Sequence, residues 1–216
     1  MDKKLVKNAR KPEGEFGEKI LERMNKSHES LAQWGVSHLQ ISPTDIILDV
    51  GCGGGKNIKR FAELASEGKI YGLDYSEVSV NKSKELNKEE IENGKVEIEQ
   101  GSVSQLPYGD ETFDLVTCFE TVYFWPDFIE DLKEVHRVLK NNGSIFICNE
   151  AGGADEDKEL MKEHIELLKM TLYNEEELGD SLLSAGFSEV LTFKKKKLKN
   201  SHTKILIGYV RLHENN

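Results

Sequence analysis

A short apolar run that leads directly into a cluster of glycines constrains the fold of this chain more than any other feature. Residues 45–51 read DIILDVG, which is typical of a strand buried on both faces. Four of the five positions from Gly51 to Gly55 are glycine. Apolar residues at 58–65 then recur at helical spacing. Glycines at a strand-to-helix turn permit positive φ and let a ligand approach the backbone. We therefore predict a ligand-binding loop in preference to a merely tight turn.

Strand and helix patterns alternate five times along the chain. The further predicted strands are residues 69–74, 96–101, 113–119 and 144–150. The strand at 96–101 alternates strictly, which indicates a place near the sheet edge. A helix is predicted over residues 76–91, and a helical stripe runs from Phe128 to Leu139 and is ended by residues 141–143, Asn-Asn-Gly. Such alternation predicts a parallel sheet with helices on both faces and a binding crevice at the carboxyl ends of the first strands.

The C-terminal part closes this sheet. Residues 156–171 and 175–185 are predicted helices, and residues 187–197 and 202–212 are interpreted as a closing strand pair. The expected fold is α/β and Rossmann-like, with a mostly parallel sheet of seven strands whose last pair is antiparallel.

The N-terminal segment has no place in this alternation. Residues 1–15 are polar and expected to be mobile, whereas residues 16–39 show helical spacing with a break near Ser27 and His28. We interpret residues 1–40 as a tail and helical lid and residues 41–216 as the ligand-binding domain, within a single domain overall.

Composition limits the partners. The chain has 216 residues and a formal net charge of -10, and such an acidic surface repels polyphosphate, so no nucleic-acid partner is expected. Residues 194–199, KKKKLK, are interpreted as a solvated strand edge. The N-terminus lacks an apolar leader and no run is long enough to span a bilayer, so no membrane partner is expected.

The cysteines indicate a reducing compartment. Cys52, Cys118 and Cys148 are odd in number and no pair has metal-ligand spacing, so we expect reduced thiols, a cytoplasmic location and no metal. A monomer or homodimer is expected.

Two common phosphate-binding motifs do not fit the glycine loop. A dinucleotide fingerprint requires glycine at position 56, which is Lys56, and a P-loop requires Ser or Thr at position 57, which is Asn57. Asp74 ends the second predicted strand, where a carboxylate can accept hydrogen bonds from both ribose hydroxyls. The alternative for Asp74 is a helix N-terminal charge ahead of Ser76.

The order of four motifs resembles a known family. ILDVGCGGG, YGLDYS, GSVSQLPYGDETFDLV and EVHRVLKNNGSIFI, within residues 44–150, resemble the class I S-adenosylmethionine-dependent methyltransferases, in particular the small-molecule branch called type 11. The resemblance implies that S-adenosylmethionine is the cofactor, S-adenosylhomocysteine the product and a small molecule the methyl acceptor.

The resemblance also implies roles for individual residues near the methionine and ribose parts of the cofactor. Gly51, Gly53 and Gly55 would pass beneath them, with Cys52 in the same loop. Asp49 would hold this loop near the amino acid group. Asp74 would bind the ribose hydroxyls, and Phe119 would lie near the methionine group.

At the adenine end, the resemblance places Tyr75 against the base and Ser102 and Val103 at its edge. The family usually has an acidic residue where Ser102 stands. A hydroxyl can also accept a hydrogen bond from the adenine amino group, but the contact loses its charge assistance.

The acceptor pocket is expected where residues 120–125 follow the fourth strand. Glu120, Tyr123 and His28 are the candidate catalytic or substrate-binding residues, and Trp34 is a candidate to close over the acceptor. Simple helix packing is the alternative for the aromatic residues, and a polar surface or capping position is the alternative for His28. DNA amino methylases of this fold carry Asn/Asp-Pro-Pro-Tyr here, and the ETVY of residues 120–123 argues against that activity.

Three other functions stay open at this point. An aminopropyl or carboxymethyl transferase would use a modified cofactor on the same fold. A non-catalytic module would bind the cofactor without an acceptor pocket. A nicotinamide oxidoreductase is disfavoured because the third glycine of its fingerprint is missing.

Overall fold

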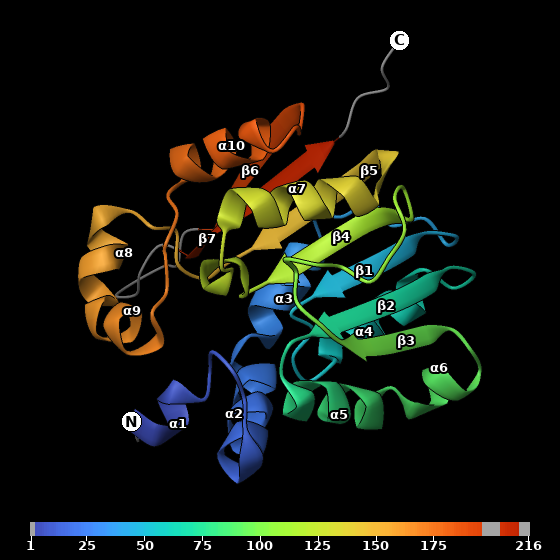
Figure 1. Ribbon diagram of the computed structural model, residues 1–216, viewed down its shortest axis with the longest axis horizontal. Coiled ribbons are helices and arrows are strands. Elements are labelled where there is room, and N and C mark those ends of the chain that lie inside the picture. The colour runs from blue at the N-terminus through green and yellow to red at the C-terminus, as the bar shows by residue number, and fades with distance from the viewer. Residues whose placement is uncertain (1–2, 196–203, 212–216) are drawn as a thin grey trace.

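The computed structural model describes the backbone of residues 3–195 and 204–211 and the side chains of residues 5–194. The described strands form one seven-stranded sheet in the order β3-β2-β1-β4-β5-β7-β6 (Figure 1). They are β1 (Ile46–Val50), β2 (Lys69–Asp74), β3 (Val96–Gln100), β4 (Phe113–Phe119), β5 (Leu139–Cys148), β6 (Glu189–Lys195) and β7 (Lys204–Arg211).

The first five strands are parallel. β1 pairs with β2 and β4, β2 with β3, and β4 with β5, whereas β7 pairs antiparallel with both β5 and β6. The predicted Rossmann-like α/β fold is confirmed, and β3 lies at the sheet edge as its alternating pattern predicted. The strand order changes direction between β1 and β4, and this is where such sheets bind ligands.

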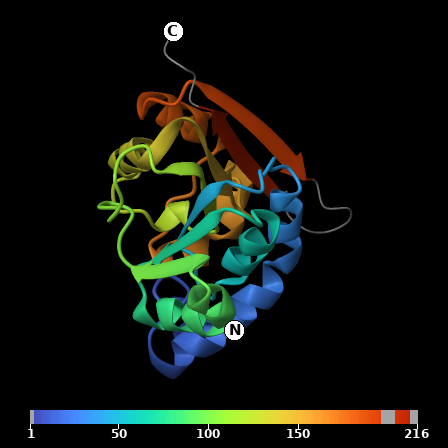
Figure 2. The same ribbon diagram turned by 90° about the vertical axis from the view of Figure 1, so that its right-hand side faces the viewer.

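Helices cover both faces of the sheet. They are α1 (Lys3–Lys7), α2 (Gly14–Ser27), α3 (Glu29–Val36), α4 (Lys56–Leu64), α5 (Glu77–Leu86), α6 (Lys88–Glu92), the 3₁₀ helix η1 (Val122–Phe124), α7 (Phe128–Val138), α8 (Asp155–Leu160), α9 (Lys162–Leu168) and α10 (Glu175–Ser184). Both ribbon views place α2 at the opposite end of the molecule from α10 (Figures 1 and 2). No helix among the described residues has the length and apolarity needed to cross a membrane.

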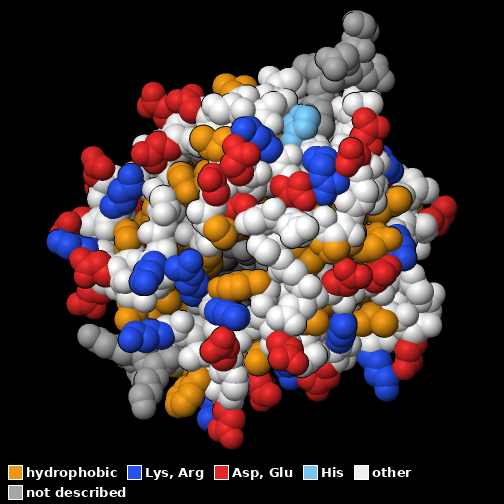
Figure 3. All heavy atoms as spheres, viewed as in Figure 1, with side chains coloured by type: hydrophobic (Ala, Val, Ile, Leu, Met, Phe, Trp, Pro, Cys, Tyr) orange, Lys and Arg blue, Asp and Glu red, His pale blue; other side chains and the backbone are white. Residues whose placement is uncertain are grey.

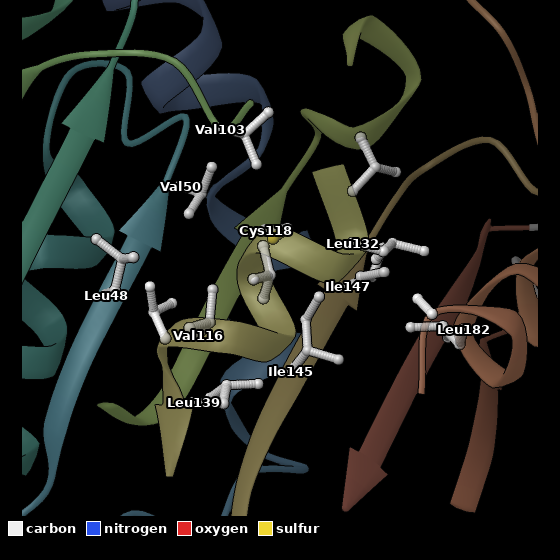
Figure 4. Close-up of a cluster of buried hydrophobic side chains, with 14 of the residues drawn as sticks. Leu48, Val50, Val103, Val116, Cys118, Leu132, Leu139, Ile145, Ile147 and Leu182 are labelled. Carbon is white, nitrogen blue, oxygen red and sulfur yellow. The ribbon is translucent and has the colours of Figure 1, made fainter. Parts of the chain in front are cut away.

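Continuous apolar strands fill two cores at once. Successive side chains of a strand point to opposite faces, so Ile145 and Ile147 pack toward α7 and α10, whereas Phe146 packs toward α3 and α4. Figure 4 shows the first of these clusters, with Leu132 of α7 and Leu182 of α10 beside the strand residues. Burial on both faces thus explains why β4 and residues 144–148 of β5 do not alternate between apolar and exposed polar residues.

Three predicted helix boundaries were wrong. The helix predicted to continue to the stop signal at residues 141–143 ends at Val138, because Leu139 pairs with Phe113 and begins β5. The helix predicted over 156–171 is interrupted at Met161 and ends at Lys169, which has a left-handed φ of 52°. The helix predicted through residue 91 breaks at Asn87.

The N-terminus also differs from its prediction. Residues 3–7, expected to be mobile, form α1, and Val6 is buried among residues of the α9 region. The break predicted near Ser27 and His28 is present between α2 and α3.

The charged surface is mixed in sign. On the face shown in Figure 3, basic and acidic side chains are interspersed. Of the lysine run at 194–199, residues 196–199 lie outside the described residues, and Lys194 pairs with Glu175 of α10.

The break at Asn87 generates a stability prediction. The buried Asn87 amide donates to the carbonyls of Gly55 at 3.1 Å and Ser83 at 2.8 Å, so it attaches α5 to the glycine loop. We expect Asn87→Ala to lower the free energy of unfolding by about 1–3 kcal/mol, because it leaves a buried carbonyl without its donor. The exposed Asn141→Ala is the control and should stay within about 0.5 kcal/mol of the wild type in urea titrations. Equal losses for both variants would contradict this role.

Candidate functional site

The loop between β1 and α4 has the backbone that its glycines predicted. Gly51, Gly53 and Gly55 have φ values of 74°, 52° and 79°, a region that residues with a Cβ rarely adopt. The N–H groups of Gly51 and Cys52 donate to the Leu73 carbonyl at 2.7 and 3.1 Å. These bonds fix the loop against the end of β2.

Asp74 ties this loop to the next helix. It is 7% exposed, and its Oδ2 accepts from the Gly53 N–H while its Oδ1 accepts from the Ser76 N–H, both at 2.9 Å. Burial raises the pKa of the Asp74 carboxyl, and the two backbone donors oppose this rise. Asp74 therefore lines a cavity and also lies beside the N-terminus of α5, so its position does not decide between the two sequence-based interpretations.

Asp49 is buried deeper in the same edge of the sheet. It is 2% exposed, and the Thr117 hydroxyl donates to its Oδ1 at 2.6 Å. Burial is the main cause that raises the pKa of Asp49 to about 7, and the nearby Asp74 adds to the rise. Thr117 of β4 was not singled out from the sequence, because a Thr within a buried apolar run carries no local signal of a partner.

Two cavities lie at the carboxyl ends of these strands. The first, of about 110 Å³, lies between the glycine loop and the N-terminal helices, and the second, of about 120 Å³, lies toward β3 and η1. The residues common to both walls are Arg10, Gly51, Asp74, Tyr75, Thr121 and Phe124. The two cavities therefore meet beside Asp74.

Most of the residues predicted to bind a cofactor line these cavities. Those in the first wall are Asp49, Gly51, Cys52, Gly53, Asp74, Tyr75 and Phe119, and Ser102 and Val103 lie in the second. Gly55 differs, since it lines neither cavity and an added Cβ there would lie 2.6 Å from Asn87 Nδ2 on the α5 side. Gly54 lines the first cavity instead.

Gly53 faces open space. A Cβ added at Gly53 would have one heavy atom within 4 Å, the Leu21 Cδ2 at 3.8 Å, and both residues line the first cavity. A ligand can therefore approach the backbone closely at this glycine.

The three candidate acceptor residues converge. His28 lies between α2 and α3, Glu120 follows β4, and Tyr123 belongs to η1. The His28 Nε2 is 3.8 Å from Glu120 Oε2, and the Tyr123 hydroxyl donates to the same oxygen at 2.8 Å. His28 and Glu120 line the first cavity, whereas Tyr123 is buried behind them. Burial raises the pKa of Glu120.

Glu150 was missed by the sequence reasoning. It follows β5, and its backbone N–H donates to the Glu120 carboxylate. No local pattern marks it, because its proximity to Glu120 arises from the parallel pairing of β4 with β5.

Trp34 does not have the position expected of it. The centroids of the Trp34 and His38 rings are 4.9 Å apart, and the two rings are nearly perpendicular. Trp34 packs against the hydrophobic core between α3 and the sheet, and it lines neither cavity. The expectation that Trp34 closes over an acceptor is therefore wrong.

A short N-terminal segment, residues 9–12, covers the cavities and is called the strap below. The Tyr75 hydroxyl donates to the Arg10 carbonyl, and the Ser76 hydroxyl donates to the Pro12 carbonyl at 2.6 Å. The Arg10 guanidinium donates to the carbonyls of Leu168 and Lys169, both at 3.2 Å. None of these contacts had a sequence signal, since the strap is polar and irregular.

Known proteins share both sequence and fold with this chain. A family profile described as “Methyltransferase domain” matches residues 48–147. Demethylmenaquinone methyltransferase of Bacillus mycoides is 38% identical over 115 residues, which are 52% of this chain and 47% of that protein. The 24-methylenesterol C-methyltransferase 2 of Arabidopsis thaliana is 31% identical over 142 residues, which are 66% of this chain and 38% of that protein.

The chain spans about half the length of the first curated relatives that it matches, 52% and 47% for two of them. The solved structure of an S-adenosylmethionine-dependent methyltransferase from Aquifex aeolicus matches with a TM-score of 0.67 at 19% identity. That match covers 98% of this chain and 99% of the other, so the likeness in fold extends over the whole molecule.

The buried Asp49 predicts a pH-dependent stability. Its pKa is raised from 3.8 to about 7, so between these values the folded protein holds a proton that the unfolded chain has released. This contribution to stability is largest at low pH and is lost as the pH rises through this window. Asp49→Asn keeps an acceptor for Thr117 but cannot ionise, so its free energy of unfolding relative to the wild type should increase from pH 4 to pH 7.

Urea titrations of the ligand-free protein across this range measure the effect. The exposed Asp180→Asn is the matched control and should follow the wild-type curve. Parallel curves for Asp49→Asn and the wild type would show that Asp49 does not titrate in this window.

Proposed function

We propose that this chain, which belongs to the type 11 branch of the class I S-adenosylmethionine-dependent methyltransferases, transfers a methyl group from this cofactor to a small-molecule acceptor. The observation that carries the proposal is the open glycine loop beside Asp74, at the point where two cavities meet. A nucleoside with substituents at both ends needs a site of this shape.

The residues present fit the cofactor. At Gly53 the loop leaves space that even a small side chain would begin to fill, and this suits a ligand pressed against the backbone. Asp74 has carboxylate lone pairs beyond the two used by backbone N–H groups, which supports hydrogen bonds to ribose hydroxyls. In this proposal Tyr75, Ser102 and Val103 hold the adenine end, and Asp49 and Phe119 lie at the methionine end.

The chemistry divides between cofactor and protein. When bound, the cofactor supplies a sulfonium methyl group that an acceptor atom displaces in line. The chain contributes position and the exclusion of water. His28 and Glu120, on the wall of the first cavity, are proposed to bind and orient the acceptor, and Tyr123 fixes the Glu120 carboxylate from behind.

The strap and the helices that flank it are proposed to form a lid. Each cavity is smaller than the roughly 300–1,000 Å³ of ordinary ligand pockets. A cofactor would therefore need both cavities and an outward movement of the residues between them, which include Arg10. We propose that the lid is formed by residues 3–28 and is shorter than the 1–40 expected from the sequence, because Leu31 and Gly35 of α3 pack against the sheet itself.

The acceptor is proposed to be a small molecule other than a nucleic acid. The names of the two relatives contain demethylmenaquinone and 24-methylenesterol, which are unrelated in structure, so membership of the family does not select one acceptor. The net charge of -10 disfavours a polyphosphate partner.

Calorimetry tests the proposal. S-adenosylmethionine and S-adenosylhomocysteine should both bind to the full chain with affinities in the micromolar range, whereas NAD and ATP should give no heat of binding. Methyl transfer is then followed as S-adenosylhomocysteine release in a screen of small acceptors. Binding of NAD or ATP without binding of either sulfur ligand would refute the assignment.

Gly53→Ala should separate cofactor binding from folding. The methyl group would project into the first cavity, so the affinity for S-adenosylhomocysteine should fall at least about tenfold, or 1.4 kcal/mol. Stability should fall by only about 1–2 kcal/mol because alanine must adopt a left-handed φ. Gly94→Ala is the matched control, since Gly94 has a φ of 81° with nothing near an added Cβ. It should lose similar stability and keep its affinity; equal affinity losses would place the ligand elsewhere.

Arg10→Ala tests the lid. Removal of its bonds to the Leu168 and Lys169 carbonyls should free the strap and raise the dissociation rate of S-adenosylhomocysteine by roughly tenfold, the equivalent of about 1.5 kcal/mol. Stopped-flow displacement measures this rate. Arg23→Ala, on the exposed face of α2, is the control and should leave the rate unchanged. An unchanged rate in Arg10→Ala would show that the strap does not retain the ligand.

A further inference from the structure

Three metal-ligating side chains meet at one edge of the first cavity. In residues with described side chains, the imidazole of His28 and the carboxylates of Glu120 and Glu150 each offer a ligand atom, and all these atoms lie within 4.8 Å of one another. They come from the junction of α2 with α3, from the end of β4 and from beyond the end of β5. Two of the three, His28 and Glu120, line the cavity wall.

The spacing of these atoms suits a bound cation. A metal ion about 2.0–2.2 Å from each ligand atom holds neighbouring ligands roughly 2.8–3.8 Å apart when the angles at the metal are about 90–120°. The His28 Nε2 and Glu120 Oε2 are separated by 3.8 Å, at the upper end of this range. Since all the ligand atoms lie within 4.8 Å of one another, the remaining pairs need to approach by at most about 1 Å, a small change for side chains that are only partly buried.

The surroundings of Glu120 also resemble those of a metal-binding carboxylate. The Tyr123 hydroxyl donates to Oε2 at 2.8 Å, and the Glu150 N–H donates to the same carboxylate, so its orientation is fixed before any ligand arrives. Outer hydrogen bonds of this kind commonly hold metal ligands in place. The Glu120 side chain is only 12% exposed, and a second carboxylate beside it in such a setting is disfavoured unless a cation offsets the charge.

The chemistry of the donor set indicates which cation. Carboxylates and water alone favour Mg²⁺ or Ca²⁺, whereas an imidazole nitrogen shifts the preference toward first-row transition metals. One imidazole and two carboxylates form a set suited to Mn²⁺, Fe²⁺ or Zn²⁺, with coordination positions left for water or for another ligand.

We propose that His28, Glu120 and Glu150 form a binding site for a divalent transition-metal ion on the wall of the first cavity. This departs from the expectation of no metal, which rested on cysteine spacing and could not detect ligands contributed by three distant segments. If the proposed methyl transfer also holds, the ion's open positions would bind an oxygen or nitrogen donor of the acceptor. The binding test does not depend on that condition.

Manganese binding tests the site directly. The full chain, without an affinity tag and after treatment with a chelator, is titrated with Mn²⁺, and the signal of free Mn²⁺ is followed by electron paramagnetic resonance. We expect saturation at one ion per chain and displacement by Zn²⁺. His28→Ala and Glu150→Gln should each weaken Mn²⁺ binding at least about tenfold.

Two exposed residues of α9 provide matched controls. His164→Ala and Glu163→Gln remove the same kinds of side chain from the surface and should bind Mn²⁺ like the wild type. Thermal unfolding of each variant shows whether it is folded, and the nearly isosteric Glu150→Gln decides the result if His28→Ala does not fold. The proposal is overturned if the wild type shows no saturable binding at millimolar Mn²⁺, or if Glu150→Gln binds as tightly as Glu163→Gln.

Discussion

The geometry of the site depends on the two hydrogen bonds that the Asp74 carboxylate accepts. This carboxylate accepts hydrogen bonds from the glycine loop at Gly53 and from the start of α5 at Ser76, so one side chain sets the distance between two ligand-facing segments. The Ser76 hydroxyl then binds the Pro12 carbonyl of the strap. Loop, helix and strap are therefore connected through Asp74, the last residue of β2, and Ser76, two positions later.

Parallel topology gathers charge at this edge of the sheet. Asp49, Asp74, Glu120 and Glu150 lie at or just beyond the carboxyl ends of β1, β2, β4 and β5, and the order of the strands makes them neighbours. Carboxylates so close together would repel one another in water-poor surroundings. Three of them accept hydrogen bonds from backbone N–H groups or hydroxyls: Asp49 from Thr117, Asp74 from Gly53 and Ser76, and Glu120 from Tyr123 and Glu150.

Sequence patterns within a few neighbouring residues predicted the strands and the glycine loop, whose conformation depends mainly on those residues. Alternating apolar runs and glycines gave the parallel strands, the loop at Gly51 and Gly53, and the position of Asp74. Asn87 ended a helix against its pattern because its amide bonds to the loop carbonyl of Gly55, a partner distant in sequence. Leu139 likewise joined β5 since Phe113 pairs with it across the sheet.

Contacts between distant segments account for the rest of the site. Arg10 reaches the end of α9, and Glu150 reaches Glu120 only after the sheet has formed. The sequence suggested His28, Glu120 and Tyr123 separately, and only the folded chain brings them within contact distance. Gly55 was predicted to bind the cofactor, but its position is explained by packing. A Cβ there would collide with Ser83 and Asn87 on the α5 side.

The attachment of the strap has a kinetic consequence. Its anchors differ in kind: Tyr75 lines both cavities, with the buried Ser76 next to it, whereas the carbonyls of Leu168 and Lys169 lie at the C-terminal end of α9. A ligand beside Tyr75 would compete with the first anchor and leave the second intact, so the strap would hinge from the α9 side. In the proposed enzyme, the ligand would then enter and leave on the Tyr75 side of the strap, while the α9 side stays closed.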